Sequence, residues 1–95
     1  MNLDDYVVDV LMRDLVGHDR QPTSFLVYLW FYFEASRARR DRVNVSYQAL
    51  AEAVGISKSA AQSAVRWLVR RKLLESSKAS PTAIPEYRVT RPWRR

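Results

Sequence analysis

Apolar residues recur at steps of three and four through the first fifteen positions, which predicts an amphipathic helix. These apolar positions are Leu3, Tyr6, Val7, Val10, Leu11 and Leu15. Aspartates near the start suit the positive end of a helix dipole, and Gly17 is the expected end of the helix. Val8, Met12 and Val16 broaden the apolar face. We therefore expect this helix to lie in a groove or against a second subunit.

A run of nine apolar residues begins at Phe25 and ends at Phe33, and Pro22 suits the first turn of its helix. A helix that is apolar on every side must be covered on most sides, which predicts a central core helix. Alternatively, part of the run forms a dimer interface, because aromatic residues are favoured interface anchors. The two interpretations are compatible. The aromatic candidates for an interface are Tyr28, Trp30, Phe31 and Tyr32.

Residues 36–42 are polar and contain four arginines. Arginines at this place either stabilise the carboxyl end of the preceding helix or contact phosphate. The next three residues, Val43, Asn44 and Val45, alternate in polarity and predict a short strand.

Two short helical patterns then meet at a tight corner. Ser46 is the expected cap of the first helix, whose apolar positions are Tyr47, Leu50, Ala51 and Val54. Gly55 supplies the left-handed conformation that ends this helix, and Ser57 caps the next one. Two helices joined by about three residues that include glycine cross steeply, which is a helix-turn-helix arrangement.

The second helix, from Lys58 to about residue 71, has two distinct faces at 100° per residue. Its predicted buried residues are Ala61, Ala64, Val65 and Leu68. Its predicted outward residues are Ser59, Gln62, Ser63, Arg66 and Arg70. Trp67 lies between the two faces, where packing against the apolar helix is favoured over base stacking.

A strand at residues 73–78, a loop at residues 79–85 and a strand at residues 86–90 predict a β-hairpin after this helix. The expected fold is mostly α with a small β-hairpin, in one domain. Residues 1–42 form a helical part that is able to dimerise, and residues 43–90 contain the helix-turn-helix and the hairpin. Residues 91–95 form a basic tail that is expected to be flexible. The tail adds phosphate affinity, is simply solvated, or leads into a longer protein.

Charge is divided unevenly along the chain, whose formal net charge is +6. Residues 1–24 carry five aspartates against two arginines, which gives −3. Residues 25–95 carry fourteen lysines and arginines against five acidic residues, which gives +9. A basic surplus in the part with the helix-turn-helix fits a polyanionic partner or an ordinary solvated surface.

Several function classes find no support in the residues. The chain has no cysteine, which excludes disulfides and thiolate metal sites, and His18 is its single histidine. With Gly17 and Gly55 as the two glycines, no glycine-rich phosphate loop is present. The nine-residue apolar run is about half the length of a membrane span, and aspartates interrupt the apolar stretch that a signal peptide needs. We expect a cytoplasmic protein that is not an enzyme and has no metal or cofactor.

The segment from Leu50-Ala51 through Val54-Gly55-Ile56-Ser57 to Leu73-Leu74 resembles the winged helix-turn-helix of MarR-like and GntR-like bacterial regulators and of related plasmid and phage replication initiators. The resemblance covers at most residues 43–90. It implies that the hairpin is a wing, with Lys78, Ser80 and Arg88 near the minor groove or the backbone. Two positions depart from the family pattern: Lys72 replaces a usual glycine, and Ala60 replaces a frequent threonine or arginine.

The expected function is double-stranded DNA binding by a transcriptional regulator that forms a homodimer through the apolar run and the amino-terminal helix. The expected DNA contacts are Lys58, Ser59, Gln62, Ser63, Arg66, Arg70, Lys78 and Arg88. Gln62 is suited to adenine, the serines to bases or phosphate, and Arg66 to guanine or the backbone. The alternatives are a replication or plasmid- and phage-maintenance protein that uses the same fold on DNA, and a winged-helix module that binds another protein. No effector is evident, although a pocket between the first two helices is conceivable.

Overall fold

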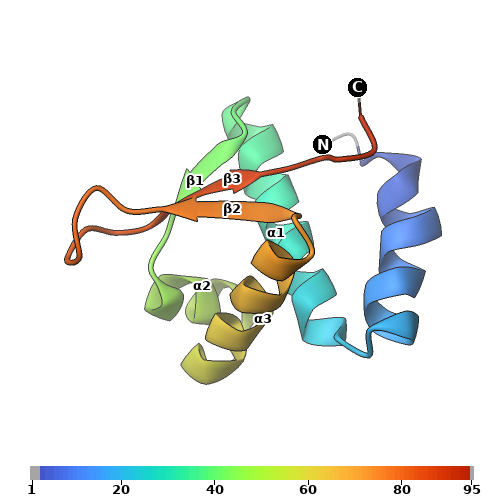
Figure 1. The fold of residues 1–95 in the computed structure, drawn as a ribbon, viewed down its shortest axis with the longest axis horizontal. Coiled ribbons are helices and arrows are strands. Elements are labelled where there is room, and N and C mark those ends of the chain that lie inside the picture. The colour runs from blue at the N-terminus through green and yellow to red at the C-terminus, as the bar shows by residue number, and fades with distance from the viewer. Residues whose placement is uncertain (1–2, 95) are drawn as a thin grey trace.

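α1 (Pro22–Ala38) forms the centre of the fold and contacts every other element except β2. The computed structural model describes residues 3–94. The other elements are η1 (Val7–His18), β1 (Arg42–Asn44), α2 (Tyr47–Val54), α3 (Lys58–Arg70), β2 (Leu74–Ser77) and β3 (Glu86–Val89). In Figure 1, η1 lies on one side of the molecule, and α2, α3 and the sheet lie on the other. The prediction of a mostly helical chain with a small antiparallel hairpin is confirmed.

The three strands form one antiparallel sheet in the order β1-β3-β2. β3 therefore lies in the middle, and Tyr87 pairs with Val43 on one side and Ser76 on the other. Tyr87 and Val89 are buried, while Glu86 and Arg88 alternate with them on the outer face. The predicted short strand before α2 thus becomes the third strand of the hairpin's sheet, shifted by one residue toward the amino terminus.

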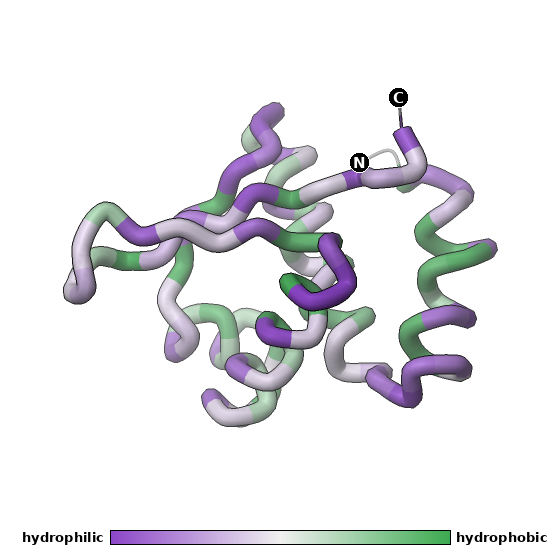
Figure 2. Tube along the Cα trace, viewed as in Figure 1, coloured by the Kyte–Doolittle hydropathy of each residue, from purple (hydrophilic) through white to green (hydrophobic). Residues whose placement is uncertain are grey.

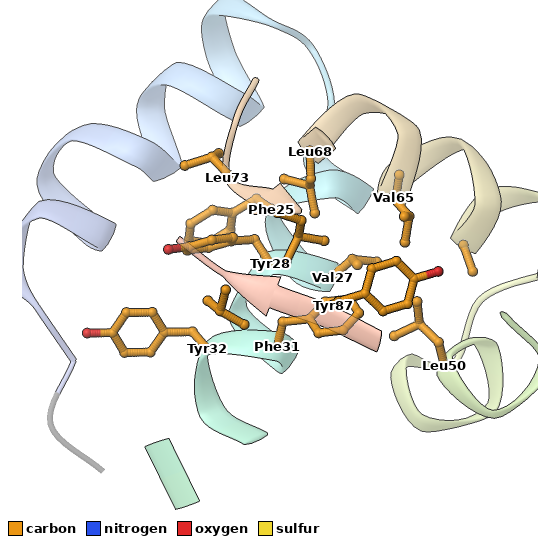
Figure 3. Close-up of a cluster of buried hydrophobic side chains, with 14 of the residues drawn as sticks. Phe25, Val27, Tyr28, Phe31, Tyr32, Leu50, Val65, Leu68, Leu73 and Tyr87 are labelled. Atoms are coloured by element: carbon orange, nitrogen blue, oxygen red, sulfur yellow. The ribbon is translucent and has the colours of Figure 1, made fainter. Parts of the chain in front are cut away.

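The aromatic run in α1 supplies more buried apolar side chains to the core than any other element does (Figure 3). Tyr28, Phe31 and Tyr32 are completely buried, and Phe31 meets Tyr87 edge-on at a ring-centroid distance of 5.2 Å. The prediction of a central core helix is confirmed. Of the four aromatic candidates for a dimer interface, these three are therefore covered within the chain, and Trp30 is the one that remains partly exposed. Within residues 3–94, no helix combines the length and apolar content needed to cross a membrane.

η1 winds with the wider hydrogen-bond pattern of a π-helix, which the apolar spacing did not predict. Its buried residues are Val7, Leu11 and Leu15. Its other apolar residues remain outward: Val8, Met12 and Val16 are 43%, 40% and 39% exposed. Apolar stretches are visible along this helix in Figure 2.

The sequence predicts that the first helix ends at Gly17, but η1 continues through His18. The N–H of Asp19 still donates to the carbonyl of Asp14 at 2.8 Å, so the hydrogen-bond ladder passes the glycine. The left-handed residue of this connection is Arg20, at φ 56°. Residues five apart are neighbours in this winding, which brings Asp14 and Asp19 together at the end of the helix.

The carboxyl-terminal segment is docked against the start of the chain, so the prediction of a flexible tail is wrong for residues 91–94. The indole of Trp93 stacks on Tyr6 at 4.7 Å, and its Nε1 donates to Oδ2 of Asp4 at 2.9 Å. Arg94 donates to both carboxylate oxygens of Asp4, at 2.6 and 2.7 Å. The acidic partner of this basic segment is Asp4, which precedes η1. Arg95 lies outside the described residues.

The hydrogen bonds from Arg94 and Trp93 lower the pKa of Asp4 to about 2. A carboxyl group with a lowered folded-state pKa stabilises the fold above its ordinary pKa and loses that contribution as the pH falls. We expect Asp4→Asn to lower the free energy of unfolding by about 1–2 kcal/mol at neutral pH.

This difference from the wild type should shrink between pH 4 and pH 2, as Asp4 itself becomes neutral, which denaturant unfolding at a series of pH values measures. Asp5→Asn is the matched control, since Asp5 is exposed and has no ion pair among the described residues. Equal pH profiles for the two variants would contradict the role assigned to Asp4.

Lys72 lies two residues after the end of α3 and adopts a left-handed backbone conformation, at φ 61°. Its carbonyl accepts from the hydroxyl of Thr90 at 2.5 Å, and the N–H of Leu73 returns to the carbonyl of Leu68 at 2.9 Å. Lys72 therefore holds a backbone conformation that favours glycine.

Left-handed backbone disfavours side chains by roughly 1–2 kcal/mol, and glycine loses part of this gain through its unfolded-state entropy. We expect Lys72→Gly to raise the free energy of unfolding by about 0.5–1 kcal/mol in thermal or denaturant unfolding. Lys72→Ala keeps the strain while removing the same charge. An equal gain in both variants would assign the effect to charge.

Candidate nucleic-acid interface

The corner between α2 and α3 is built from serine caps, as predicted. The hydroxyl of Ser46 accepts from the N–H of Ala49 at 3.1 Å. The hydroxyl of Ser57 accepts from the N–H of Ala60, also at 3.1 Å. Each cap satisfies an N–H that the first turn of a helix leaves without a partner. The starts of both helices are therefore defined by their own sequence.

Gly55 makes the reversal between the caps. It adopts φ 86°, and its N–H donates to the carbonyl of Ala51 at 2.8 Å. A left-handed residue at this place closes α2 and lets the next residue fold back toward the core, where Ile56 is half-buried. The corner is a short, hydrogen-bonded structure that holds α2 and α3 at a set angle.

α3 divides into the two predicted faces. Its buried residues are Ala61, Ala64, Val65 and Leu68, the same four that the helical spacing identifies. The small alanines allow α1 and α2 to approach closely, and α3 contacts both. Packing therefore directs the opposite face of α3 into solvent.

This outward face gathers most of the predicted DNA contacts on one element. Its exposed members are Lys58, Ser59, Ser63, Arg66 and Arg70, and Gln62 is half-buried beside them. Among the described residues, none of its three cations forms an ion pair. The guanidinium of Arg70 lies over the ring of Trp67 at 5.5 Å. The face presents positive charge with no carboxylate neutralising it.

Not all of the short polar side chains at the front of α3 are free to bind a ligand. The hydroxyl of Ser59 lies 3.3 Å from the hydroxyl of the capping Ser57, which occupies one of its hydrogen-bonding positions. Gln62 and Ser63 have no side-chain hydrogen bond within residues 3–94. Those two are the polar groups most available to a ligand.

The two predicted contacts on the hairpin differ from one another. Lys78 is exposed and begins the loop that projects beyond the end of the sheet (Figure 1). Arg88 lies on the outer face of β3, as predicted, but between two carboxylates. Its Nε is 3.0 Å from Glu75, and its Nη1 is 3.7 Å from Asp41. Arg88 is therefore a weaker candidate for a phosphate contact than predicted, because these two carboxylates already compensate its charge.

The arginines that follow α1 also divide into paired and unpaired groups. Arg37 pairs with Glu34 and lies over the ring of Phe33, and Arg42 meets Glu86 at 3.0 Å. Arg39 and Arg40 are exposed and have no ion pair among the described residues. The paired arginines thus take part in local ion pairs, while stabilisation of the helix end and phosphate contact both stay predictions.

A polar anchor joins the end of η1 to the back of α3. Nε1 of Trp67 donates to Oδ2 of Asp19 at 3.0 Å. Arg71 pairs with Asp14 and, at 3.5 Å, with Asp19. Burial opposes ionisation of Asp19, but hydrogen bonds from His18 and Trp67 and the charge of Arg71 outweigh it and lower its pKa. The packing role of Trp67 is confirmed, with an acidic partner that spacing did not reveal.

The same cluster is a poor metal site. Ligand atoms of Asp14, His18 and Asp19 lie within 4.8 Å of one another. The guanidinium of Arg71 lies against both carboxylates, so a metal ion would meet a positive charge at the place where its ligands converge. The arrangement acts as an anchor between elements.

Comparison with protein-family models, with curated proteins and with solved structures finds no match for this chain.

Proposed function

We propose that residues 43–90 form a winged helix-turn-helix that binds double-stranded DNA. The observation that carries this proposal is the outward face of α3, where unpaired cations and short polar side chains follow a capped corner. A helix presented in this way fits the major groove, and the β2-β3 hairpin, with Lys78 in its loop, takes the place of a wing.

The two ends of α3 have different roles in this arrangement. Gln62 and Ser63 lie in its first half and face base edges, where a glutamine amide matches adenine. Arg66 and Arg70 follow one turn apart and reach phosphates or guanine. Because Ser59 is engaged with its cap and Ala60 offers no polar group, few base-reading groups remain. Affinity then comes mainly from phosphate contacts and selectivity from few positions.

The biological role that fits best is transcriptional regulation in the cytoplasm, with replication or plasmid maintenance as the alternative on the same fold. Selection of bound duplexes from a random pool distinguishes both of these DNA-binding roles from a module that binds another protein. Enrichment of a motif supports DNA recognition, and half-site symmetry in that motif indicates a dimer.

Binding to a duplex should weaken steeply with salt, since each neutralised phosphate contributes about −0.9 to the slope of log K against log salt. We expect Arg66→Gln to reduce the magnitude of this slope by about 1 and to weaken binding several-fold at every salt concentration. Fluorescence anisotropy with a labelled duplex measures both quantities.

Arg13→Gln is the matched control, because it removes the same charge from an exposed arginine on η1 that forms no ion pair among the described residues. Arg88→Gln should change the slope less than Arg66→Gln, owing to its two carboxylate partners. No binding of wild-type protein to a random duplex at about 50 mM salt would sink the proposal.

We also propose that the domain acts as a homodimer through the apolar surface that the fold leaves uncovered. On α1, Leu26 and Phe33 are 51% and 38% exposed, and Leu29 and Trp30 lie between them, half-buried. These four side chains line one shallow apolar groove with Leu3 and Val54. A second copy is the favoured occupant, because paired recognition helices read two half-sites and such interfaces are apolar at their centre.

Leu26→Glu should shift the protein from dimer to monomer in sedimentation equilibrium without unfolding it, since Leu26 is half exposed. Ile84→Glu, at a 61% exposed position in the hairpin loop, is the control and should leave the dimer intact. A wild-type protein that remains monomeric at all soluble concentrations would contradict the proposed dimer.

A further inference from the structure

A second basic surface lies at the base of the hairpin, where β2 begins and β3 ends. It surrounds a hollow of about 430 Å³, at the end of the sheet opposite the exposed hairpin loop (Figure 1). Four of the residues that line this hollow are cations. The polar residues around it are Lys72, Glu75, Arg88, Thr90, Arg91 and Arg94.

Two of the four cations are already paired within the fold. Nε of Arg88 lies 3.0 Å from a carboxylate oxygen of Glu75, which is the one acidic residue that lines the hollow within residues 3–94. Arg88 also meets Asp41 at 3.7 Å. Arg94 pairs with Asp4 at 2.6 Å. These pairs hold the walls of the hollow in place, and they leave its uncompensated charge to the other two cations.

Those two cations, Lys72 and Arg91, form no ion pair among the described residues. Lys72 is exposed, whereas Arg91 is half-buried and holds its guanidinium over the ring of Tyr32 at 4.6 Å. Nε of Arg91 is buried without a hydrogen-bond partner and therefore faces the interior, so Nη1 and Nη2 are the side-chain nitrogens that Arg91 offers to the hollow. A partly desolvated cation with no carboxylate beside it favours an anion as its neighbour.

The backbone joins the two segments that carry these cations. The hydroxyl of Thr90 donates to the carbonyl of Lys72 at 2.5 Å, and the N–H of Thr90 donates to the carbonyl of Leu73 at 3.1 Å. Lys72 lines the hollow from a left-handed conformation that glycine would adopt with less strain. Residues held in strained conformations cluster at functional sites. A lysine at this position therefore indicates a use for its side chain.

We propose that this hollow binds a small organic phosphate monoester. A monoester carries a charge of about −1.5 to −2 at neutral pH, which matches the two unpaired cations. A guanidinium donates parallel hydrogen bonds to phosphate oxygens, and an ammonium group adds a compact positive charge. The hollow has the size of a small-molecule site, and the exposed Pro92 adds apolar surface for the organic part of the ligand.

Both the charge and the position of the hollow favour a free ligand over duplex DNA. A phosphodiester of the DNA backbone carries one negative charge and would leave one of the two cations uncompensated. The hollow also lies at the end of the sheet opposite the loop that Lys78 begins, which is the part of the hairpin that the proposed function places on the duplex. The site is therefore independent of DNA binding by α3.

Titration of the ¹⁵N-labelled protein with methyl phosphate tests the site, with sodium chloride at matched ionic strength as the reference. The amide resonances of Lys72 and Arg91 should shift saturably. Dimethyl phosphate, a diester with a single charge, stands for the DNA backbone. It should bind about fivefold more weakly, which is the upper end of what one exposed ion pair contributes.

Substitutions of Lys72 separate its charge from its effect on the fold. Lys72→Gly removes the charge and relieves the backbone strain, so it should weaken methyl phosphate binding about fivefold in a protein that is more stable than the wild type. Loss of structure cannot explain such a result. Lys72→Arg should retain binding. Lys78→Ala is the matched control, because it removes the same charge from an exposed lysine in the hairpin loop and should leave binding unchanged.

Three results would each overturn the site. The first is a wild-type response to methyl phosphate no larger than the response to sodium chloride. The second is equal affinity for the monoester and the diester, and the third is an equal loss of binding in Lys72→Gly and Lys78→Ala. Because no duplex enters the titration, its outcome leaves the proposed DNA binding untouched.

Discussion

The fold depends on the burial of α1 from nearly every side. Its aromatic run would be insoluble as an exposed helix, so η1, α2, α3 and the sheet each have an apolar surface to cover. Tyr28 illustrates how complete this burial is: desolvation raises the pKa of its hydroxyl, which donates to the carbonyl of Thr90 at 2.9 Å. Since α3 packs on α1 through small residues, the direction of its outward face follows from the position of the core helix.

Local features of the fold could be predicted from the sequence, because they depend on residues close together in the chain. Ser46, Gly55 and Ser57 specify the corner through caps and one left-handed residue, and helical spacing separates the buried from the outward residues of α3. For the candidate site, this periodicity identifies which side chains share a face. It holds no information on which charges will be neutralised.

The contacts that the sequence did not reveal join distant residues. Arg71 meets Asp14 across 57 positions, and Trp93 meets Asp4 across 89. The charge of Arg88 is paired with carboxylates on two other segments. Such pairs depend on how whole elements pack against one another. The spacing of residues along the chain does not predict that packing. The π-helical winding of η1 was also not predicted from local spacing. In this winding Asp14 and Asp19 lie close enough together for both to pair with Arg71.

Charge separation along the chain has a structural meaning that its net value conceals. Three of the five aspartates in the first 24 residues bind arginines near the end of α3 or in the last described segment. This pairing places a negative helix on the side of the molecule away from the α2-α3 corner (Figure 1). The three cations on the outward face of α3 take part in none of these pairs, so that face keeps its positive charge, which favours a polyanionic partner there.

The contact between Asp4 and the Trp93-Arg94 pair also makes the chain nearly circular. With Asp4 held against Trp93 and Arg94, the order of elements between them is a closed path, and the loop at residues 78–85 is an exposed place at which that path can be opened. A circular permutant that begins in this loop, with the original ends joined by a short linker, would retain the core and the α3 face while separating the two hairpin strands in sequence. The connection between β2 and β3 could then be changed without altering α3, which precedes the hairpin.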